Sequence, residues 1–318
     1  MRMKHIAAAL MDHECIAILC HVSPDGDTLG SALAIRRALI SLGRAAVVVC
    51  QDEVPQMYRF MPDAETVMGP DSLPFVPDCA LFVDIAAADR AGTALPVGMS
   101  APCKVLLDHH ATNEGFVPIH FVDGDASSVG ELSLELIDQL GVALDLEMAV
   151  QIYVAIASDT GNFGFSYTTP AALRAVARCI EAGLEIDEVS RRLFRLRTVS
   201  RTRLIGVGLS LMERYDGGRI AGTTLTQAAM DSVNATSEAT EGLVNYLNEM
   251  EGVMACFLAT ERGIQTKVSL RSGDDVDVGE VAFALGGGGH ARAAGVTIPL
   301  PPDEAVAVVL EALRRAMG

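Results

Sequence analysis

Short apolar runs alternate with helical patterns throughout residues 15–160, and this alternation limits the folds that are open to the chain. Three of the runs, at 15–20, 79–83 and 104–107, are as short as buried strands. Buried strands that alternate with helices are typical of a parallel sheet that carries helices on both faces. The sequence therefore predicts an α/β fold for the first part of the chain.

The first apolar run is followed at once by His21, Asp25 and Asp27, which have the spacing i, i+4, i+6. A helical pattern begins at Thr28, so the three side chains fall in a turn between a strand and a helix. Gly26 allows this turn to be sharp because it has no Cβ. Ligands of open α/β sheets bind beyond the carboxyl ends of the strands. The spacing therefore predicts a metal site in the turn.

Three further segments bring side chains of the same kind to the same edge. Asp84 follows the second run, Asp108, His109 and His110 follow the third, and Asp159 ends a helical stretch. Asp84 or Asp159 alone is more often a helix cap or a turn residue, and either histidine alone is as often a structural imidazole as a ligand. Together, carboxylates and imidazoles without a thiolate suit manganese, magnesium or iron, and a shared aspartate is able to bridge two ions. We interpret the set as a two-metal site.

A run of four glycines, 286–289, lies between an apolar helical pattern at 278–285 and a core strand pattern at 293–298. A flexible linker is the alternative interpretation, but a linker is not expected between two core elements. Bare backbone brings N–H groups close to a phosphate or a nucleobase. The candidate substrate contacts here are Gly287, Gly288, Gly289, His290 and Arg292. Just upstream, residues 263–272 alternate like a strand with Lys267, Ser269 and Arg271 on its solvated face.

On these motifs the chain resembles the DHH phosphoesterase family, in its stand-alone branch of nanoRNases and pAp phosphatases. The resemblance runs essentially end to end and includes the sequence Gly-Gly-Gly-Gly-His-Ala-Arg-Ala-Ala-Gly at 286–295. It implies a C-terminal DHH-associated domain that holds the terminal nucleotide, with Arg271 and His290 as substrate contacts. It also implies a homodimer.

The resemblance further implies which residues hold two Mn²⁺ ions, with Mg²⁺ or another divalent cation as alternatives. One ion is expected at His21, Asp25 and Asp84, and the other at Asp27, Asp84, His109 and Asp159. Asp84 then bridges the pair, Asp108 orients an imidazole, and His110 faces the substrate phosphate. Two such ions supply an activated water and neutralise phosphoryl oxygens.

The activity that the resemblance implies is hydrolysis of short oligoribonucleotides and pApA to mononucleotides, and of 3′-phosphoadenosine 5′-phosphate (pAp) to AMP. A cyclic di-AMP phosphodiesterase is the nearest alternative, because the same ligands and glycine loop suit it. A nucleotide-binding module without catalysis is a further alternative. It is disfavoured because every expected ligand is present, whereas a non-catalytic relative is free to lose some.

The length of 318 residues predicts more than one domain. We expect a metal-binding catalytic domain at 1–184, an arginine-rich helical connector at 185–216, and a smaller mixed α/β domain at 217–318 that binds substrate. Glycines 217 and 218 mark the start of the last domain.

The net charge of −17 argues against long nucleic acid as a partner, because proteins that follow a phosphate backbone normally present a basic surface. Short oligonucleotides held by metal ions tolerate an acidic exterior. Seven cysteines without a Cys-x-x-Cys motif indicate a reducing compartment. The sequence has no apolar stretch long enough to cross a bilayer, so we expect a cytoplasmic protein without a membrane partner.

Overall fold

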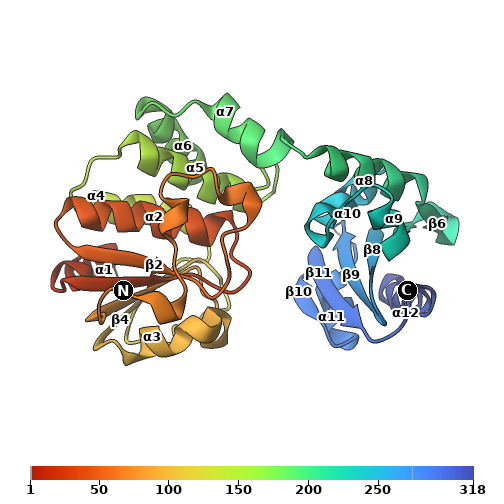
Figure 1. Cartoon of the computed structure of the whole chain (residues 1–318), viewed down its shortest axis with the longest axis horizontal. Helices are drawn as coiled ribbons and strands as arrows, with labels where there is room; N and C mark the ends of the chain where they lie inside the picture. Colours follow the sequence, from red (N-terminus) through yellow and green to blue (C-terminus); the bar gives the residue numbers. More distant parts are fainter. Residues whose placement is uncertain (1, 274) are drawn as a thin grey trace. The chain divides into compact units, whose positions relative to one another are not determined.

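The computed structural model describes residues 2–273 and 275–318, and for His290 it describes the backbone alone. The chain folds into two compact units, Met1–Leu196 and Arg197–Gly318 (Figure 1). The segment expected as a helical connector is divided between them. Its first part forms α7 (Ile186–Ser190) and a π-helical turn, while its second part forms α8 (Val199–Ser210) and a short strand.

The first unit contains a five-stranded sheet in the order β2-β1-β3-β4-β5, and every neighbouring pair is parallel. The strands are β1 (Cys15–Leu19), β2 (Ala45–Val49), β3 (Cys79–Val83), β4 (Cys103–Asp108) and β5 (Ile119–Val122). Because all five run the same way, their carboxyl ends meet at one edge. Side chains that directly follow β1, β3 and β4 therefore come together there.

Both faces of this sheet are covered, as the alternation of strands and helices predicted. One face packs against α1 (Met3–Met11), α2 (Gly26–Ser41), α4 (Val129–Gln139), α5 (Leu146–Asp159) and α6 (Pro170–Glu181). The other face packs against α3 (Leu95–Ser100) and the turns around it, through Leu19, Phe82 and Leu106 (Figure 1). Alternate residues of each strand thus belong to different cores, which explains why the strands read as continuous apolar runs.

The second unit has a six-stranded mixed sheet in the order β10-β11-β9-β8-β7-β6, in which β7 and β8 are parallel. The strands are β6 (Glu213–Tyr215), β7 (Ile220–Leu225), β8 (Ala255–Arg262), β9 (Gln265–Ser272), β10 (Gly288–His290) and β11 (Ala293–Ile298). Helices α11 (Val278–Ala284) and α12 (Pro302–Met317) pack on one face, and α8, α9 (Gln227–Asp231) and α10 (Leu243–Asn248) on the other. The smaller mixed α/β architecture that the sequence predicted is confirmed.

Short helical turns complete the fold, at Gln56–Tyr58, Ala64–Thr66, Pro70–Ser72, Ala88–Ala94, Arg191–Arg195, Asp216–Gly218 and Ser237–Thr240. Within the described residues, the helices are too short or too polar for any of them to cross a bilayer.

Candidate active site

Asp84 lies at the centre of the site, directly after β3. Its φ is +59°, a left-handed backbone that is uncommon for a residue with a side chain and that clusters at functional sites. Oδ2 lies 3.4 Å from His21 Nε2, and Oδ1 lies 3.7 Å from His109 Nε2. Oδ1 is buried and accepts no hydrogen bond from the described residues. Asp84 therefore presents a buried, unsatisfied oxygen between two imidazoles.

His21 and Asp25 stand beside Asp84 on the turn between β1 and α2. The Nδ1 atom of His21 lies 2.9 Å from the carbonyl oxygen of Val22, so Nδ1 carries the proton and Nε2 faces the carboxylates. Nε2 is 3.6 Å from Asp25 Oδ1. Asp25 also caps α2, because Oδ1 accepts hydrogen bonds from the backbone N–H groups of Asp27 and Thr28. One aspartate thus starts the helix and faces the site.

Asp27, His109 and Asp159 form a second group beside the first. His109 Nε2 lies 3.2 Å from Asp159 Oδ2 and 3.9 Å from Asp27 Oδ2. Asp27 is fully buried and accepts hydrogen bonds from the backbone N–H groups of Val129 (2.7 Å) and Gly130 (2.9 Å). These N–H groups belong to the first turn of α4, where the helix dipole favours negative charge. The first turn of α4 therefore fixes the position of this buried carboxyl group.

The support that α4 gives to Asp27 was missed at the sequence level. The pattern at Ser128 and Val129 signals a helix start, but a sequence does not indicate which side chain that helix end will meet. The role of Asn113, which follows the third cluster by three residues, was not predicted either. Its side-chain NH₂ donates to Asp108 Oδ2 (2.6 Å) and to the carbonyl oxygen of Ile85 (3.0 Å).

Asp108 is fully buried and contacts His110. His110 Nδ1 lies 2.8 Å from Asp108 Oδ1 and donates to it, which fixes the orientation of the ring. Although burial opposes it, this hydrogen bond and that of Asn113 hold the pKa of Asp108 below its usual range. His110 is also 3.6 Å from Asp84 Oδ1. The eight candidate residues of the first unit therefore come together at one edge of the sheet.

Replacement of Asp108 by Asn is expected to lower kcat by about ten- to a hundredfold, which is the usual effect of losing a group that orients a site imidazole. The amide has the same shape but no charge to hold the protonated Nδ1 of His110. Metal content is expected to change little, because Asp108 faces His110 and Asn113. Steady-state kinetics and metal analysis test this, with exposed Asp125→Asn as the control. Loss of metal together with activity would contradict the assignment.

The crowded carboxylates of the site retain protons when no metal is present. Burial, together with the charges of Asp84 and Asp25, raises the pKa of Asp159 to about 8. Burial and the same kind of repulsion raise the pKa of Asp27. Burial lowers the pKa of His21, but its contacts with Asp25 and Asp84 outweigh this and raise it to about 10. The site therefore favours positive charge, which protons or metal ions can supply.

We expect the metal-free protein to lose stability as the pH rises from about 4 to about 8. The folded state keeps the proton of Asp159 until about pH 8, whereas the unfolded chain releases it near 3.8. His21 adds to this trend, because the stabilisation from its raised pKa is complete below 6.5 and is lost as the pH approaches 10. The lowered pKa of Asp25 matters only below about 3.8.

Urea unfolding in a chelator at about pH 5 and about pH 8 measures this effect. A lower midpoint at the higher pH is the expected result, and added divalent metal is expected to remove the difference. An equal or higher midpoint at the higher pH would show that Asp159 and His21 do not dominate the pH dependence of stability.

The second unit holds the predicted substrate contacts. The alternation of β9 is confirmed, since Lys267 is exposed and Ser269 and Arg271 are partly exposed between buried neighbours. Arg271 Nη1 donates to the carbonyl oxygen of Leu270. Arg292 Nη1 donates to the carbonyl oxygens of Gly273 and Val276, so this guanidinium helps to fix the chain before α11. The predicted role of the His290 side chain lies outside the described residues.

Part of the glycine run, in which the sequence suggested bare backbone near the substrate, forms a strand. Gly288 and Gly289 belong to β10 and pair with Gly295 and Ala294 of β11. A Cβ at Gly287 would lie 2.3 Å from the carbonyl oxygen of Gly295, so close approach to β11 already explains this glycine. A Cβ at Gly288 would meet nothing within 4 Å. Within this run, Gly288 is thus the strand glycine with open space beside it.

Comparison with known proteins identifies the family to which this chain belongs. The N-terminal domain of the DHH family matches residues 15–157, and the DHHA1 domain matches residues 222–318. The chain belongs to the DHH phosphoesterase family, as its motifs predicted, and its activity is that of a phosphoesterase.

Individual relatives and solved structures give more specific comparisons. A Thermus thermophilus protein named bifunctional oligoribonuclease and PAP phosphatase NrnA is 36% identical over 305 residues, which cover 95% of this chain and 90% of the relative. The crystal structure of an exopolyphosphatase-related protein from Bacteroides fragilis has a TM-score of 0.93 at 26% identity, covering 98% and 95% of the two chains. RecJ from T. thermophilus in complex with Mn²⁺ has a TM-score of 0.59 at 15% identity, covering 98% of this chain and 55% of RecJ, so it shares the fold.

Proposed function

We propose that this protein hydrolyses short oligoribonucleotides, including pApA, to mononucleotides and removes the 3′-phosphate of pAp to give AMP. The observation that carries the proposal is that the buried Asp84 belongs to two groups of carboxylates and imidazoles, one with His21 and Asp25 and the other with His109 and His110. The similarity to the Thermus oligoribonuclease and PAP phosphatase, which spans nearly the whole of both chains, supports the choice of substrate.

Two divalent cations, which we propose to be Mn²⁺, fit the residues that are present. His21, Asp25 and Asp84 form one ligand group, and Asp27, His109 and Asp159 form another, with Asp84 placed 3.7 Å from His109 to serve both. The unsatisfied Asp84 Oδ1 is the oxygen that a cation would complete. When bound, such ions activate water and neutralise the phosphoryl oxygens. Mg²⁺ suits the same oxygen-rich donors.

The protein's own contribution is to hold these donors in place. The first turn of α4 fixes Asp27, and backbone carbonyl oxygens fix the rings of His21 and His109 through Nδ1. Asp108 fixes His110, which we propose donates to a phosphate oxygen of the substrate. The donors thus need little rearrangement during the reaction, which is the main source of electrostatic catalysis.

A parallel assay with Mn²⁺ tests the proposed function. Its substrates are pApA, a pentanucleotide RNA, an RNA of about two dozen nucleotides, pAp, cyclic di-AMP and pyrophosphate. We expect fast hydrolysis of pApA, the pentanucleotide and pAp, with the long RNA slow because of the net charge of −17. Preferential cleavage of cyclic di-AMP would redirect the assignment to that substrate, and inactivity on all six with metal bound would overturn it.

We propose that Arg271 contacts the substrate, together with His290 and the glycine run. Replacement of Arg271 by Ala is expected to raise KM by about ten- to a hundredfold, because a hydrogen bond to a charged group contributes about 1.5–3 kcal/mol. Metal content should stay unchanged. The matched control is Arg262→Ala, which removes an exposed arginine at the end of β8. An equal effect of both variants would argue against a specific contact.

We also propose that the enzyme is a cytoplasmic homodimer. Seven free cysteines, five of them buried and none in a disulfide, support a reducing compartment. Light scattering of the purified protein at several concentrations tests the dimer.

A further inference from the structure

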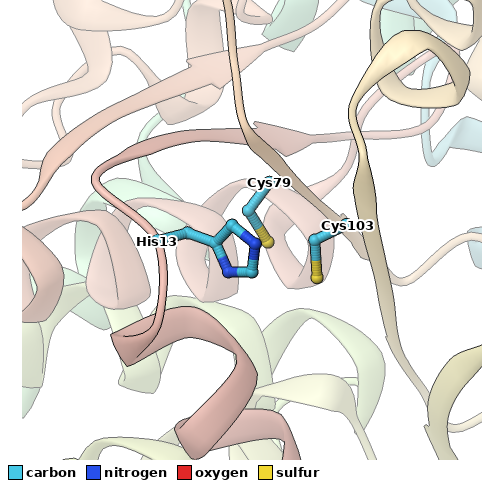
Figure 2. A group of neighbouring side chains, drawn as sticks. All are labelled: His13, Cys79 and Cys103. Carbon is cyan, nitrogen blue, oxygen red and sulfur yellow. The ribbon is translucent and has the colours of Figure 1, made fainter.

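A second group of potential ligands lies at the amino ends of the strands, whereas the carboxylate site lies at their carboxyl ends. Cys79 is the first residue of β3, and Cys103 is the first residue of β4, where the two are register partners. His13 lies in the turn between α1 and β1. One ligand atom from each of the three residues lies within 4.8 Å of the others, and Figure 2 shows the ring of His13 directed toward the sulfur of Cys79.

The tautomer of His13 is suited to binding a metal ion. Its Nδ1 lies 2.7 Å from the carbonyl oxygen of Ala9. A carbonyl oxygen only accepts, so Nδ1 carries the proton and the lone pair of the neutral ring is on Nε2. Histidines that bind metals commonly donate their other ring N–H to a backbone carbonyl in this way. The hydrogen bond therefore leaves Nε2 available to a cation.

The backbone holds the three residues together without a metal. The carboxylate of Asp78 accepts hydrogen bonds from the N–H groups of Glu14 (3.1 Å) and Cys15 (2.9 Å), which fixes the turn that carries His13. The N–H of Cys103 donates to the carbonyl oxygen of Asp78 (3.1 Å). Cys79 is fully buried, whereas His13 and Cys103 are partly exposed. The cluster is thus organised by the fold and remains open to solvent on one side.

We propose that His13, Cys79 and Cys103 bind one Zn²⁺ ion, with water in the fourth position. Two thiolates and an imidazole are soft donors that select zinc over manganese or magnesium, so the two sites differ in metal preference. Sulfurs on one tetrahedral zinc lie about 3.8 Å apart, given Zn–S bonds of about 2.3 Å. The ligand atoms of the three residues now lie up to 4.8 Å apart, so they would need to move about 1 Å closer together to bind zinc. The ion would tie the turn after α1 to two strands.

Cadmium titration of the full-length, metal-free protein tests the proposal, because a thiolate bound to cadmium gives an ultraviolet charge-transfer band. The carboxylate site does not contribute, since none of its ligand groups contains a cysteine. We expect a band that saturates at one equivalent in the wild type and is absent from Cys79→Ser/Cys103→Ser. Cys15→Ser is the matched control, because Cys15 is partly exposed at the same sheet edge but lies outside the cluster.

A second variant covers the case in which the double substitution prevents folding. His13→Ala changes one partly exposed side chain. Removing a group that only orients a metal ligand weakens binding about ten- to a hundredfold, so removing the ligand His13 is expected to weaken cadmium binding by more than this. Zinc should also raise the unfolding temperature more in the wild type than in His13→Ala. No thiolate band in the reduced wild type, or an unchanged affinity in His13→Ala, would overturn the proposal. So would a Cys79–Cys103 disulfide in protein purified with reductant.

Discussion

Replacing Asp84 with Asn is expected to lower kcat about a thousandfold, equivalent to about 4 kcal/mol of transition-state stabilisation. Asp84 is the one carboxylate shared by two of the described ligand groups, and its two oxygens face His21 and His109. Asn keeps the shape of the side chain and tolerates the left-handed backbone at this position. The loss of kcat therefore measures the effect of removing the negative charge of Asp84.

The measurement combines kcat for pApA with the metal content of the dialysed protein, which is expected to fall in parallel. Asp89→Asn is the matched control, because Asp89 is exposed and lies five residues further along the same segment. Near-normal turnover in Asp84→Asn would exclude a role for this carboxylate in joining two metal sites.

Chelation of divalent metal is expected to abolish hydrolysis, and added Mn²⁺ is expected to restore more activity than Mg²⁺. Without cations the cluster holds protons, as the pKa of about 8 for Asp159 indicates, so neither water activation nor phosphate neutralisation is available. Imidazole donors favour manganese over magnesium, which prefers oxygen alone. The rate of pApA hydrolysis after dialysis against chelator, followed by titration with each metal, gives the result.

A control separates the two proposed metal sites. Manganese should restore activity equally in the wild type and in His13→Ala, because soft donors bind manganese weakly. An enzyme that keeps its activity in excess chelator would refute the two-metal mechanism. The cadmium titration would then still test the proposed zinc site separately.

The fold of the first unit was predictable because its signals are local. Strands buried on both faces are apolar throughout, and the helices between them force a parallel arrangement. The glycine run shows where such reasoning was incomplete. Four successive glycines suggested bare backbone near a substrate, but the close approach of Gly287 to β11 is a tertiary constraint that the run itself does not reveal.

The side chains expected to bind metal were also predictable by position. His21, Asp84 and His109 each follow a parallel strand, so the sheet itself brings them to one edge. Their roles as ligands remain a prediction. The supports around them come from elements distant in sequence, such as the first turn of α4 at Asp27, which lies more than a hundred residues along the chain.

The sequence by itself therefore determined the class of fold, the family and the edge at which the charged residues meet, because each depends on short-range pattern. Only the tertiary structure decided which groups satisfy those charges. It alone placed His13, Cys79 and Cys103 together, because their proximity depends on how two parallel strands and a preceding turn align at the amino edge of the sheet. His13 lies 66 residues before Cys79, and Cys79 lies 24 residues before Cys103, so the three match no recognisable metal motif. The register of β3 and β4 nevertheless places the two cysteines side by side.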